Sequence, residues 1–398
     1  MRVPFLVVAI AWFATMAGAN LATPLYAVYE REFGFSSAVL TVVFATYMIV
    51  LAPSLLVFGQ LSDRFGRRRV MAAGFATATV GLLTFAAAQS LPWLFAARSL
   101  QGVAVGMVAG AAAAALVELD PAPQEERAAL FTSLAQAGGS GSGPVIAGML
   151  AEWAPHRLVL PFALFALFGV AAAISALAIP EPAAKIKVPG TFKLVRPSVP
   201  AEIRTLFLRA SLTGAAVWAV ASTFLSVVPS YAGELLDTSN LALLGAVSGT
   251  MLATSCVAQI AVRKRPPAHA RDQAVGLLLL AAGLVALVLA FPANSLALLI
   301  LAGVLSGAGH GLAILAAQGQ INLAAPPDRR GAVNAAFYTL IYLGVATSVM
   351  SIGLMTLVVS LSTAVTVYAA GIAVVALATA AWHVRPSVGR PARPVPPR

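Results

Sequence analysis

Residues 59–69 decide how the rest of this sequence is interpreted. They read Gly59-Gln60-Leu61-Ser62-Asp63-Arg64-Phe65-Gly66-Arg67-Arg68-Arg69 and join two long apolar runs. One carboxylate lies among four arginines, and two glycines bracket the first half of the stretch. Cationic side chains beside hydrocarbon mark the cytoplasmic edge of a membrane, so charge alone predicts a positive-inside anchor here.

The composition places the whole chain in a membrane. Of the 398 residues, 60% are hydrophobic and only 10% are charged, whereas soluble domains carry about 25% charged residues. A spanning helix needs about 20 residues, so about twelve spans fit. We expect helices, because open strands cannot satisfy their backbone in lipid and the alternation of a barrel is absent. The apolar segments lie at about 5–28, 37–60, 70–89, 92–118, 128–151, 158–180, 206–232, 240–262, 273–292, 295–323, 331–355 and 360–383.

The distribution of charge predicts the topology. With the N-terminus in the cytoplasm, 22 of the 25 Lys and Arg residues fall on the cytoplasmic side, and only Arg31 and Arg157 fall outside. We therefore expect a multi-pass protein of a bacterial-type inner (plasma) membrane with both termini in the cytoplasm. The net charge of +11 is spread over the loops of one face, which argues against nucleic-acid binding.

The sequence gives little support for a disulfide, a metal or cofactor site, or an enzyme. Cys256 is the single cysteine, which excludes an intrachain disulfide and a multi-cysteine metal site. Histidines and acids are scattered, so we expect no metal and no cofactor. The chain has no nucleophile–base set and no phosphate-binding loop, and an enzyme is therefore not expected.

An internal repeat divides the chain into two six-helix halves. The fourth segment carries glycines at 102, 106 and 110, and the tenth carries glycines at 303, 307 and 311. Glycine at every fourth position lets a second backbone approach closely, and its recurrence in both halves is what a transporter built of parallel repeats predicts. The expected units are a bundle at 1–180, a cytoplasmic linker at 181–205, a second bundle at 206–383 and a disordered tail at 384–398.

Polarity varies with a period of three segments. The third, sixth, ninth and twelfth segments are nearly bare of polar side chains, whereas the first, fourth, seventh and tenth carry several. Because polar groups are costly in hydrocarbon, the second set is predicted to surround a wet central path and the first set to face lipid. The side chains expected around a shared cavity are Asn20, Tyr26, Gln101, Gln136, Trp218, His310, Tyr338 and Tyr342.

The stretch at 59–69 resembles the loop between the second and third helices of the major facilitator superfamily. This resemblance implies a gate, in which Asp63 accepts hydrogen bonds from the N-terminal amides of the eleventh helix near Gly331 and locks the two halves together. Gly59 would lie where a larger side chain would block close helix contact. Local pairing of Asp63 with Arg64 or Arg67 is the alternative. The matching residues are Gly59, Asp63, Arg64, Gly66, Arg67 and Arg68.

A second motif lies on the fourth segment. Arg98, followed by Gln101 and Gly102, resembles the pattern of the family's fourth helix. Arg98 is predicted to face the cavity, where it would polarise a nearby acid or meet an anionic substrate. The alternative is that Arg98 snorkels to the outer interface of the membrane.

A third motif lies on the fifth segment, at Gly139-Ser140-Gly141-Ser142-Gly143-Pro144-Val145-Ile146-Ala147-Gly148. It resembles the signature associated with antiporters of the superfamily, and the matching positions are Gly139, Gly143, Pro144 and Gly148. Gly139 and Gly143 share a helix face and permit tight packing, while Pro144 removes a backbone amide and kinks the helix. An ordinary kinked packing helix is the alternative.

Together these motifs resemble the 12-helix drug:proton antiporter (multidrug efflux) group. The resemblance implies an all-α membrane protein of two pseudo-symmetric six-helix bundles, a monomer in membrane lipid that exports a small amphipathic compound by alternating access against protons. One departure matters, because no carboxylate lies mid-membrane. Coupling would then fall to Arg98 or to His310, the deeply placed side chain that titrates near neutrality. The alternatives are a facilitator or exporter of sugars, amino acids or other metabolites without proton coupling, and a non-transporting receptor or scaffold.

Overall fold

The predicted all-helical membrane fold is confirmed. The computed structural model describes residues 3–120, 125–181, 197–326 and 329–384, except for the side chains at 63, 125 and 126, and every regular element in these ranges is helical. Eleven helical segments are long and apolar enough to cross a membrane. A further helix, α6 (Glu125–Trp153), has 29 residues and corresponds to the fifth predicted span, which completes the predicted set of twelve. It is less apolar because its stretch 138–143 consists only of glycine and serine.

The first six spans form the N-terminal half of the molecule. Besides α6, their elements are α1 (Val3–Ala19), η1 (Thr23–Leu25), α2 (Tyr26–Phe33), α3 (Ser37–Phe65), α4 (Arg67–Ala86), α5 (Leu91–Leu119) and α7 (Leu160–Ala178).

The last six spans form the C-terminal half. Their elements are η2 (Ala201–Ile203), α8 (Arg204–Ser226), α9 (Val228–Leu236), α10 (Leu241–Val262), α11 (His269–Ala290), α12 (Leu296–Ala324), α13 (Arg330–Met355) and α14 (Leu361–Val384). The predicted tail at 385–398 and most of the predicted linker, 182–196, lie outside the described residues.

Two spans that the sequence predicts as single helices are interrupted. The first, expected at about 5–28, stops at Ala19 and resumes through η1 and α2, and the seventh, expected at about 206–232, breaks between α8 and α9. Pro24 and Pro229 lie in the first positions of η1 and α9. Proline has no N–H to donate to the preceding turn, so each new segment starts there instead of continuing the old helix. The breaks occupy corresponding places in the two halves, as in transporters built from repeats.

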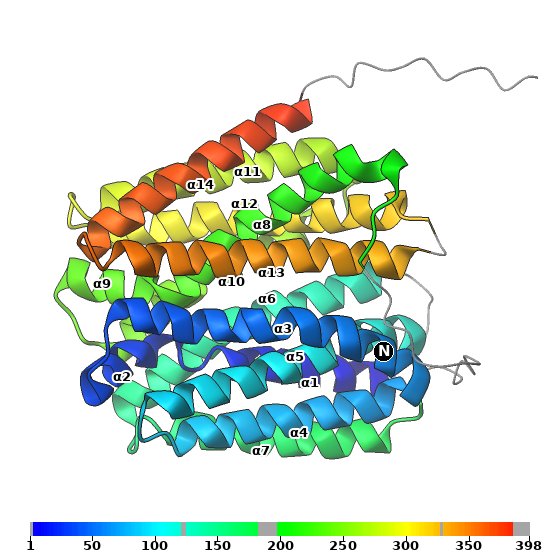
Figure 1. Cartoon of the computed structure of the whole chain (residues 1–398), viewed down its shortest axis with the longest axis horizontal. Coiled ribbons are helices and arrows are strands. Elements are labelled where there is room, and N and C mark those ends of the chain that lie inside the picture. Colours follow the sequence, from blue (N-terminus) through cyan, green and yellow to red (C-terminus); the bar gives the residue numbers. More distant parts are fainter. Residues whose placement is uncertain (1–2, 121–124, 182–196, 327–328, 385–398) are drawn as a thin grey trace, which may run out of the picture.

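The two halves meet through two pairs of helices. In the lower part of Figure 1 the N-terminal half lies against the C-terminal half above it, with α3 packed on α13 and α6 packed on α10. These pairs are equivalent under the repeat, because each joins the second span of one half to the fifth span of the other. The start of α1 and the end of α14 lie at one end of the bundle, which we call the basic end and define by the turns at 64–69, 263–271 and 329–330. The turns at 34–36, 87–90, 154–159 and 237–240 form the opposite end.

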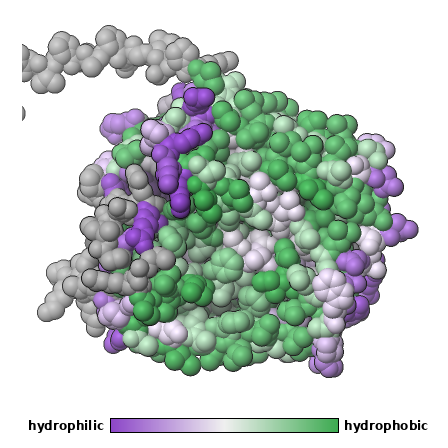
Figure 2. Space-filling view, turned by 180° about the vertical axis from the view of Figure 1, so that it is seen from behind, coloured by the Kyte–Doolittle hydropathy of each residue, from purple (hydrophilic) through white to green (hydrophobic). Residues whose placement is uncertain are grey.

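Four helices pack chiefly within their own half. α4 contacts α5 and α7, whereas α11 contacts α12 and α14. These helices correspond to the third, sixth, ninth and twelfth segments, which were predicted to face lipid. Figure 2 shows a broad apolar surface between two polar ends, as expected of a protein surrounded by a bilayer.

The two glycine stripes bring the backbones of helices together, as predicted. A Cβ atom on Gly102 would lie 2.7 Å from Tyr47 O of α3, and one on Gly106 would overlap Ser54 of the same helix. In the second half, a Cβ atom on Gly307 would overlap Met251 O of α10. Each stripe therefore packs the fourth span of its half on the second span.

The role expected for Gly59 is wrong. A Cβ atom at Gly59 would have no atom within 4 Å among the described neighbours, so the glycine is not required by close contact there. The physical reason is that the Cβ position of Gly59 faces open space, although its Cα lies next to α5. A Cβ atom at Gly110, the last glycine of the α5 stripe, would lie 3.6 Å from Gly59 Cα, which is ordinary van der Waals contact.

We expect Gly307→Ala to destabilise the protein by about 1–3 kcal/mol, because a methyl group there must push α12 away from α10. The matched control is Gly371→Ala on α14, where a Cβ atom meets nothing within 4 Å. That change should be neutral or stabilise by up to about 1 kcal/mol through helix propensity. Thermal unfolding of the two purified variants in one detergent checks this, and equal midpoints would contradict the packing.

Candidate functional site

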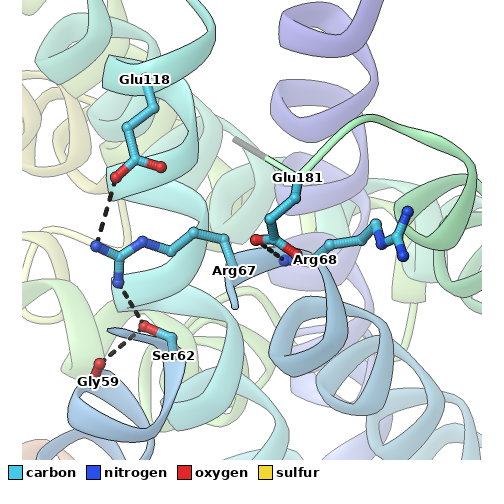
Figure 3. A network of polar contacts seen from close by, with 6 residues as sticks. All are labelled: Gly59, Ser62, Arg67, Arg68, Glu118 and Glu181. Carbon is cyan, nitrogen blue, oxygen red and sulfur yellow. Dashed lines mark hydrogen bonds and ion pairs between the residues drawn. The ribbon is translucent and has the colours of Figure 1, made fainter. Parts of the chain in front are cut away.

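Arg67 ties the end of α3 to α5 at the basic end (Figure 3). Its Nη1 donates to Ser62 Oγ at 2.7 Å, and its Nη2 lies 3.4 Å from Glu118 Oε1. Ser62 Oγ in turn donates to Gly59 O at 2.8 Å. These contacts hold the guanidinium in a partly buried site and fix the last turn of α3 against the end of α5.

The start of α4 is held by an acid that the sequence analysis missed. Glu181, directly after the last span of the first half, accepts a hydrogen bond from Arg68 N at 3.2 Å (Figure 3). Gly66 has φ of +98°, a conformation that favours glycine, and a Cβ atom there would make the Glu181 carboxylate, 2.6 Å away, move aside. A carboxylate at a helix N-terminus is stabilising. The only signal in the sequence was an isolated acid after an apolar segment.

The predicted gate contact of Asp63 cannot be placed, because the Asp63 side chain lies outside the described residues. Its neighbour Arg64 is exposed to solvent. The Arg67 network and the Glu181 cap both lie within the N-terminal half. They shape the loop, and the contact across the halves stays a prediction.

Arg98 is buried beside the break in the first span. Its side chain is 1% exposed, so it does not snorkel to the membrane surface. Nη1 donates to Ala19 O at 2.7 Å and to Gln101 Oε1 at 2.8 Å, and Nη2 donates to the Tyr26 hydroxyl. Gln101 Nε2 donates to Gly18 O at 3.3 Å. Arg98 therefore supplies a donor to the carbonyl of the last residue of α1, and Gln101 adds a second donor to Gly18 O, which also accepts from Leu21 N at 3.5 Å.

Among the described residues no carboxylate forms an ion pair with Arg98, and other groups around it compensate its charge. Four aromatic rings lie 5.3–5.8 Å from the guanidinium carbon, which is within the range of cation–π attraction. The C-terminal end of α1 adds the negative end of a helix dipole. A cavity of about 10 Å³, room for about one water molecule, adjoins Gln101. The rings belong to Tyr26, Phe44, Tyr47 and Phe85.

His310 is buried inside the C-terminal half, between α8, α10 and α12. Its ring is 1% exposed and its Nδ1 lies 2.8 Å from Ser255 Oγ. Gln259 Nε2 donates to the same Oγ at 3.2 Å, and the Trp218 ring lies edge-on with its centroid 4.9 Å away. Because Ser255 Oγ accepts from Gln259, its own hydrogen is free for Nδ1, which favours the neutral tautomer with hydrogen on Nε2.

The remaining residues expected around the cavity fall into separate groups. Asn20 lies in the break of the first span and donates to Met16 O at 2.9 Å. Tyr338 and Tyr342 stack on α13 with centroids 6.2 Å apart, and Tyr338 accepts a hydrogen bond from Gln318 at 2.7 Å. Gln136 lies on α6 and is partly exposed. The structure therefore joins Tyr26 to Gln101 through Arg98 and joins Trp218 to His310, but a single shared cavity stays a prediction.

The glycine motif of α6 packs on two different helices. Cβ atoms at Gly139 and Gly143 would overlap Phe13 O and Ala17 O of α1. On the other face of α6, a Cβ atom at Gly148 would overlap Leu241 O of α10. Two glycines of α10 face the backbone of α6 in the same way. A Cβ atom on Gly249 would lie 2.5 Å from Gly141 O, and one on Gly245 would overlap Pro144 O. Because glycines lie on two faces of α6, this helix packs closely both on α1 of its own half and on α10 of the other half.

Comparison with family models decides the family. The model described as Major Facilitator Superfamily matches residues 8–271, which is more than half of the chain. The chain belongs to the Major Facilitator Superfamily. It is therefore a multi-pass membrane protein of a transporter family. Within the described residues, no three His, Cys, Asp or Glu side chains come together as a metal site.

Curated relatives of this superfamily member include drug-resistance proteins. The puromycin resistance protein of Streptomyces alboniger is 34% identical over 38% of this chain and 30% of its own length. The class B tetracycline resistance protein of Escherichia coli is 32% identical over 38% of each chain, and the riboflavin transporter RibZ of Clostridioides difficile is 27% identical over 37% and 33%. The chain thus aligns with about a third of the length of each of these relatives.

Solved structures of superfamily members share the fold over nearly the whole chain. A nucleoside transporter superimposes with a TM-score of 0.72 at 12% identity, covering 96% of this chain and 100% of the other. A POT family transporter in complex with 5-aminolevulinic acid gives 0.76 at 13% identity and 96% coverage of both chains. At these identities the likeness concerns the fold alone.

We expect Arg98→Lys to destabilise the protein by about 1–3 kcal/mol. An ammonium cannot reproduce the fork that reaches Ala19 O, Gln101 and Tyr26 together, so buried polar groups would lose their partners. The matched control is Arg157→Lys, an exposed ion pair with Glu32, whose loss should be small. Thermal unfolding in detergent compares them, and equal effects would mean that the buried contacts contribute little.

Proposed function

We propose that this superfamily member is a secondary active transporter that exports a small amphipathic compound by alternating access in exchange for protons. The observation that carries the proposal is the packing of α6, whose antiporter-type glycines lie on α1 and on α10 of the other half. An exchanger must keep its halves sealed at one end while the path opens at the other. Backbone contact through glycine supplies such a seal without side chains.

The kind of substrate is proposed from the relatives. Their names include resistance to puromycin, tetracycline and quinolones, compounds that combine apolar rings with polar groups. The aromatic groups of this chain, Trp218 beside His310 and the Tyr338–Tyr342 stack, suit such ligands. The transporter is proposed to act as a monomer, with the substrate, protons and lipid as its partners.

The orientation is proposed from charge. The basic end carries most of the Lys and Arg residues, so it would face the cytoplasm of a bacterial-type inner membrane. The gate motif, Gly59, Asp63, Arg64, Gly66, Arg67 and Arg68, then lies on the cytoplasmic side. Arg67 and Glu181 support this proposed gate by holding the ends of α3 and α4 in place.

His310 is proposed as the proton-linked group, with Arg98 as the second candidate. His310 is one of the few titratable side chains buried at mid-helix, and its Nε2 has no partner within the described chain. A substrate oxygen or a water molecule could therefore accept from Nε2. If His310 only donates this hydrogen bond, coupling would pass instead to Arg98 together with Glu30 or Asp63.

A metabolite transporter without proton coupling is the second candidate. Two observations favour it: the sequence has no carboxylate at mid-membrane, and one relative is a riboflavin transporter. A non-transporting receptor or scaffold is favoured less, because the broken first and seventh spans supply the hinges that transport needs.

Transport by inverted membrane vesicles should distinguish these functions. With a proton gradient monitored by a fluorescent dye, adding tetracycline, puromycin, norfloxacin or ethidium should dissipate the gradient when the protein is present. This follows if each substrate molecule that moves carries protons the other way. Vesicles from the same cells without the protein are the control. Saturable substrate movement that leaves the gradient intact would support the uncoupled metabolite transporter and contradict antiport.

His310→Gln keeps a hydrogen-bonding side chain but cannot titrate. If His310 carries the proton, this variant should bind substrate within about tenfold of the wild type and lose the response of transport to an imposed pH gradient. Trp218→Phe is the matched control, since it alters the ring next to His310 and leaves the imidazole in place. A wild-type response to the gradient in His310→Gln would remove His310 as the coupling group.

A further inference from the structure

Glu152 joins the two halves at the opposite end of the bundle. It lies at the C-terminal end of α6, in the N-terminal half, and its Oε2 accepts a hydrogen bond from Leu241 N of α10 at 2.8 Å. Leu241 is the first residue of α10, in the C-terminal half. The carboxylate of one half thus caps the helix that begins in the other half.

The start of α10 is a favourable place for an anion. The first N–H groups of a helix have no partner within the helix and carry the positive end of its dipole. Asn240 satisfies one of them, because its side chain accepts from Leu243 N at 2.8 Å. Glu152 satisfies Leu241 N and adds a negative charge that Asn240 does not have. The two caps are therefore complementary, and only the one from Glu152 crosses between the halves.

The surroundings bring Glu152 into register with α10. One turn before it on α6, Gly148 lies against the backbone of Leu241, and deeper in the same interface Gly141 approaches Leu252, where a Cβ atom would lie 2.9 Å from its Cβ. A larger residue at either glycine would push α6 away and carry the carboxylate out of reach. The hydrogen bond therefore forms only when α6 and α10 are closed on each other at this end.

We propose that Glu152 is a latch that holds the opposite end of the transporter shut. The inference rests on the proposed alternating access and adds to it a residue for the second gate. The gate predicted at the basic end would use the same chemistry, a carboxylate at the end of α3 against the start of α13. If the predicted Asp63 contact forms, each end of the molecule has an acid from the N-terminal half that caps a helix of the C-terminal half, and each latch stabilises the state in which its own end is closed.

Distances between spin labels across the opposite end test the latch. Ser36 and Ser239 are exposed turn residues of the two halves at this end, and each would be replaced by cysteine in a Cys256→Ser background of the full chain in lipid nanodiscs. Removing the carboxylate in Glu152→Ala should raise the population with long label distances about two- to five-fold relative to the closed one, and Glu152→Gln should raise it less. No substrate or proton gradient is needed.

Glu32→Gln is the matched control. Glu32 is an acid at the same end that pairs with Arg157 of its own half at 3.1 Å, so its loss should leave the distances as in the wild type. Unchanged distances in both Glu152 variants, or an equal shift in Glu32→Gln, would overturn the proposal.

Hydrogen–deuterium exchange separates the latch from the transport function. In Glu152→Ala, backbone amides at the start of α10, residues 241–245, should exchange faster than in the wild type and in Glu32→Gln, since a capping partner is lost. Unchanged exchange in this segment overturns the latch whatever the protein transports. A wild type with a single label distance in every condition, together with faster exchange in the variant, would instead overturn alternating access and leave Glu152 as a static cap.

Discussion

Main-chain contact at glycine holds these helices together. In a bilayer, apolar side chains gain little by leaving lipid for protein, so close packing must supply the attraction between helices. The α5 and α12 stripes bring each fourth span onto the second span of its half, and the glycines of α6 and α10 bring the halves onto each other. The same device thus builds each bundle and also joins the two, which makes the spacing of glycines the strongest constraint on this fold.

Backbone satisfaction is the second constraint, and it explains the position of Arg98. A span that breaks within hydrocarbon leaves carbonyls that no water can reach. At the end of α1, Ala19 O receives a hydrogen bond from Arg98 of α5, and Gly18 O receives one from Gln101 in addition to a long one from Leu21 N. The cost of burying the cation is offset by the carbonyls, the helix dipole and the surrounding rings. The break in the first span therefore needs Arg98 as a hydrogen-bond donor, and the buried Arg98 needs the carbonyl at the break as an acceptor.

The sequence predicts what depends on local pattern. Span number, halves, glycine stripes and the family follow from periodicity, charge and short motifs. The breaks were not predicted, because membrane helices tolerate proline: Pro53 and Pro144 lie inside the unbroken helices α3 and α6. Glu152 and Glu181 were missed for a different reason: each is an acid at the end of an apolar segment, and its partner lies in a distant part of the chain. Gly59 was misjudged because a sequence does not show which way one position of a helix faces.

The four lipid-facing helices have a consequence for how the molecule can move in its bilayer. Since α4 and α7 pack chiefly within the first half, and α11 and α14 within the second, each half would carry its own outer helices with it in the rotation that alternating access requires. The lipid molecules that contact these outer helices would have to move with them or exchange with other lipids. In the proposed alternating-access cycle, bilayer viscosity and thickness would therefore affect the rate directly, without changing the strength of substrate binding.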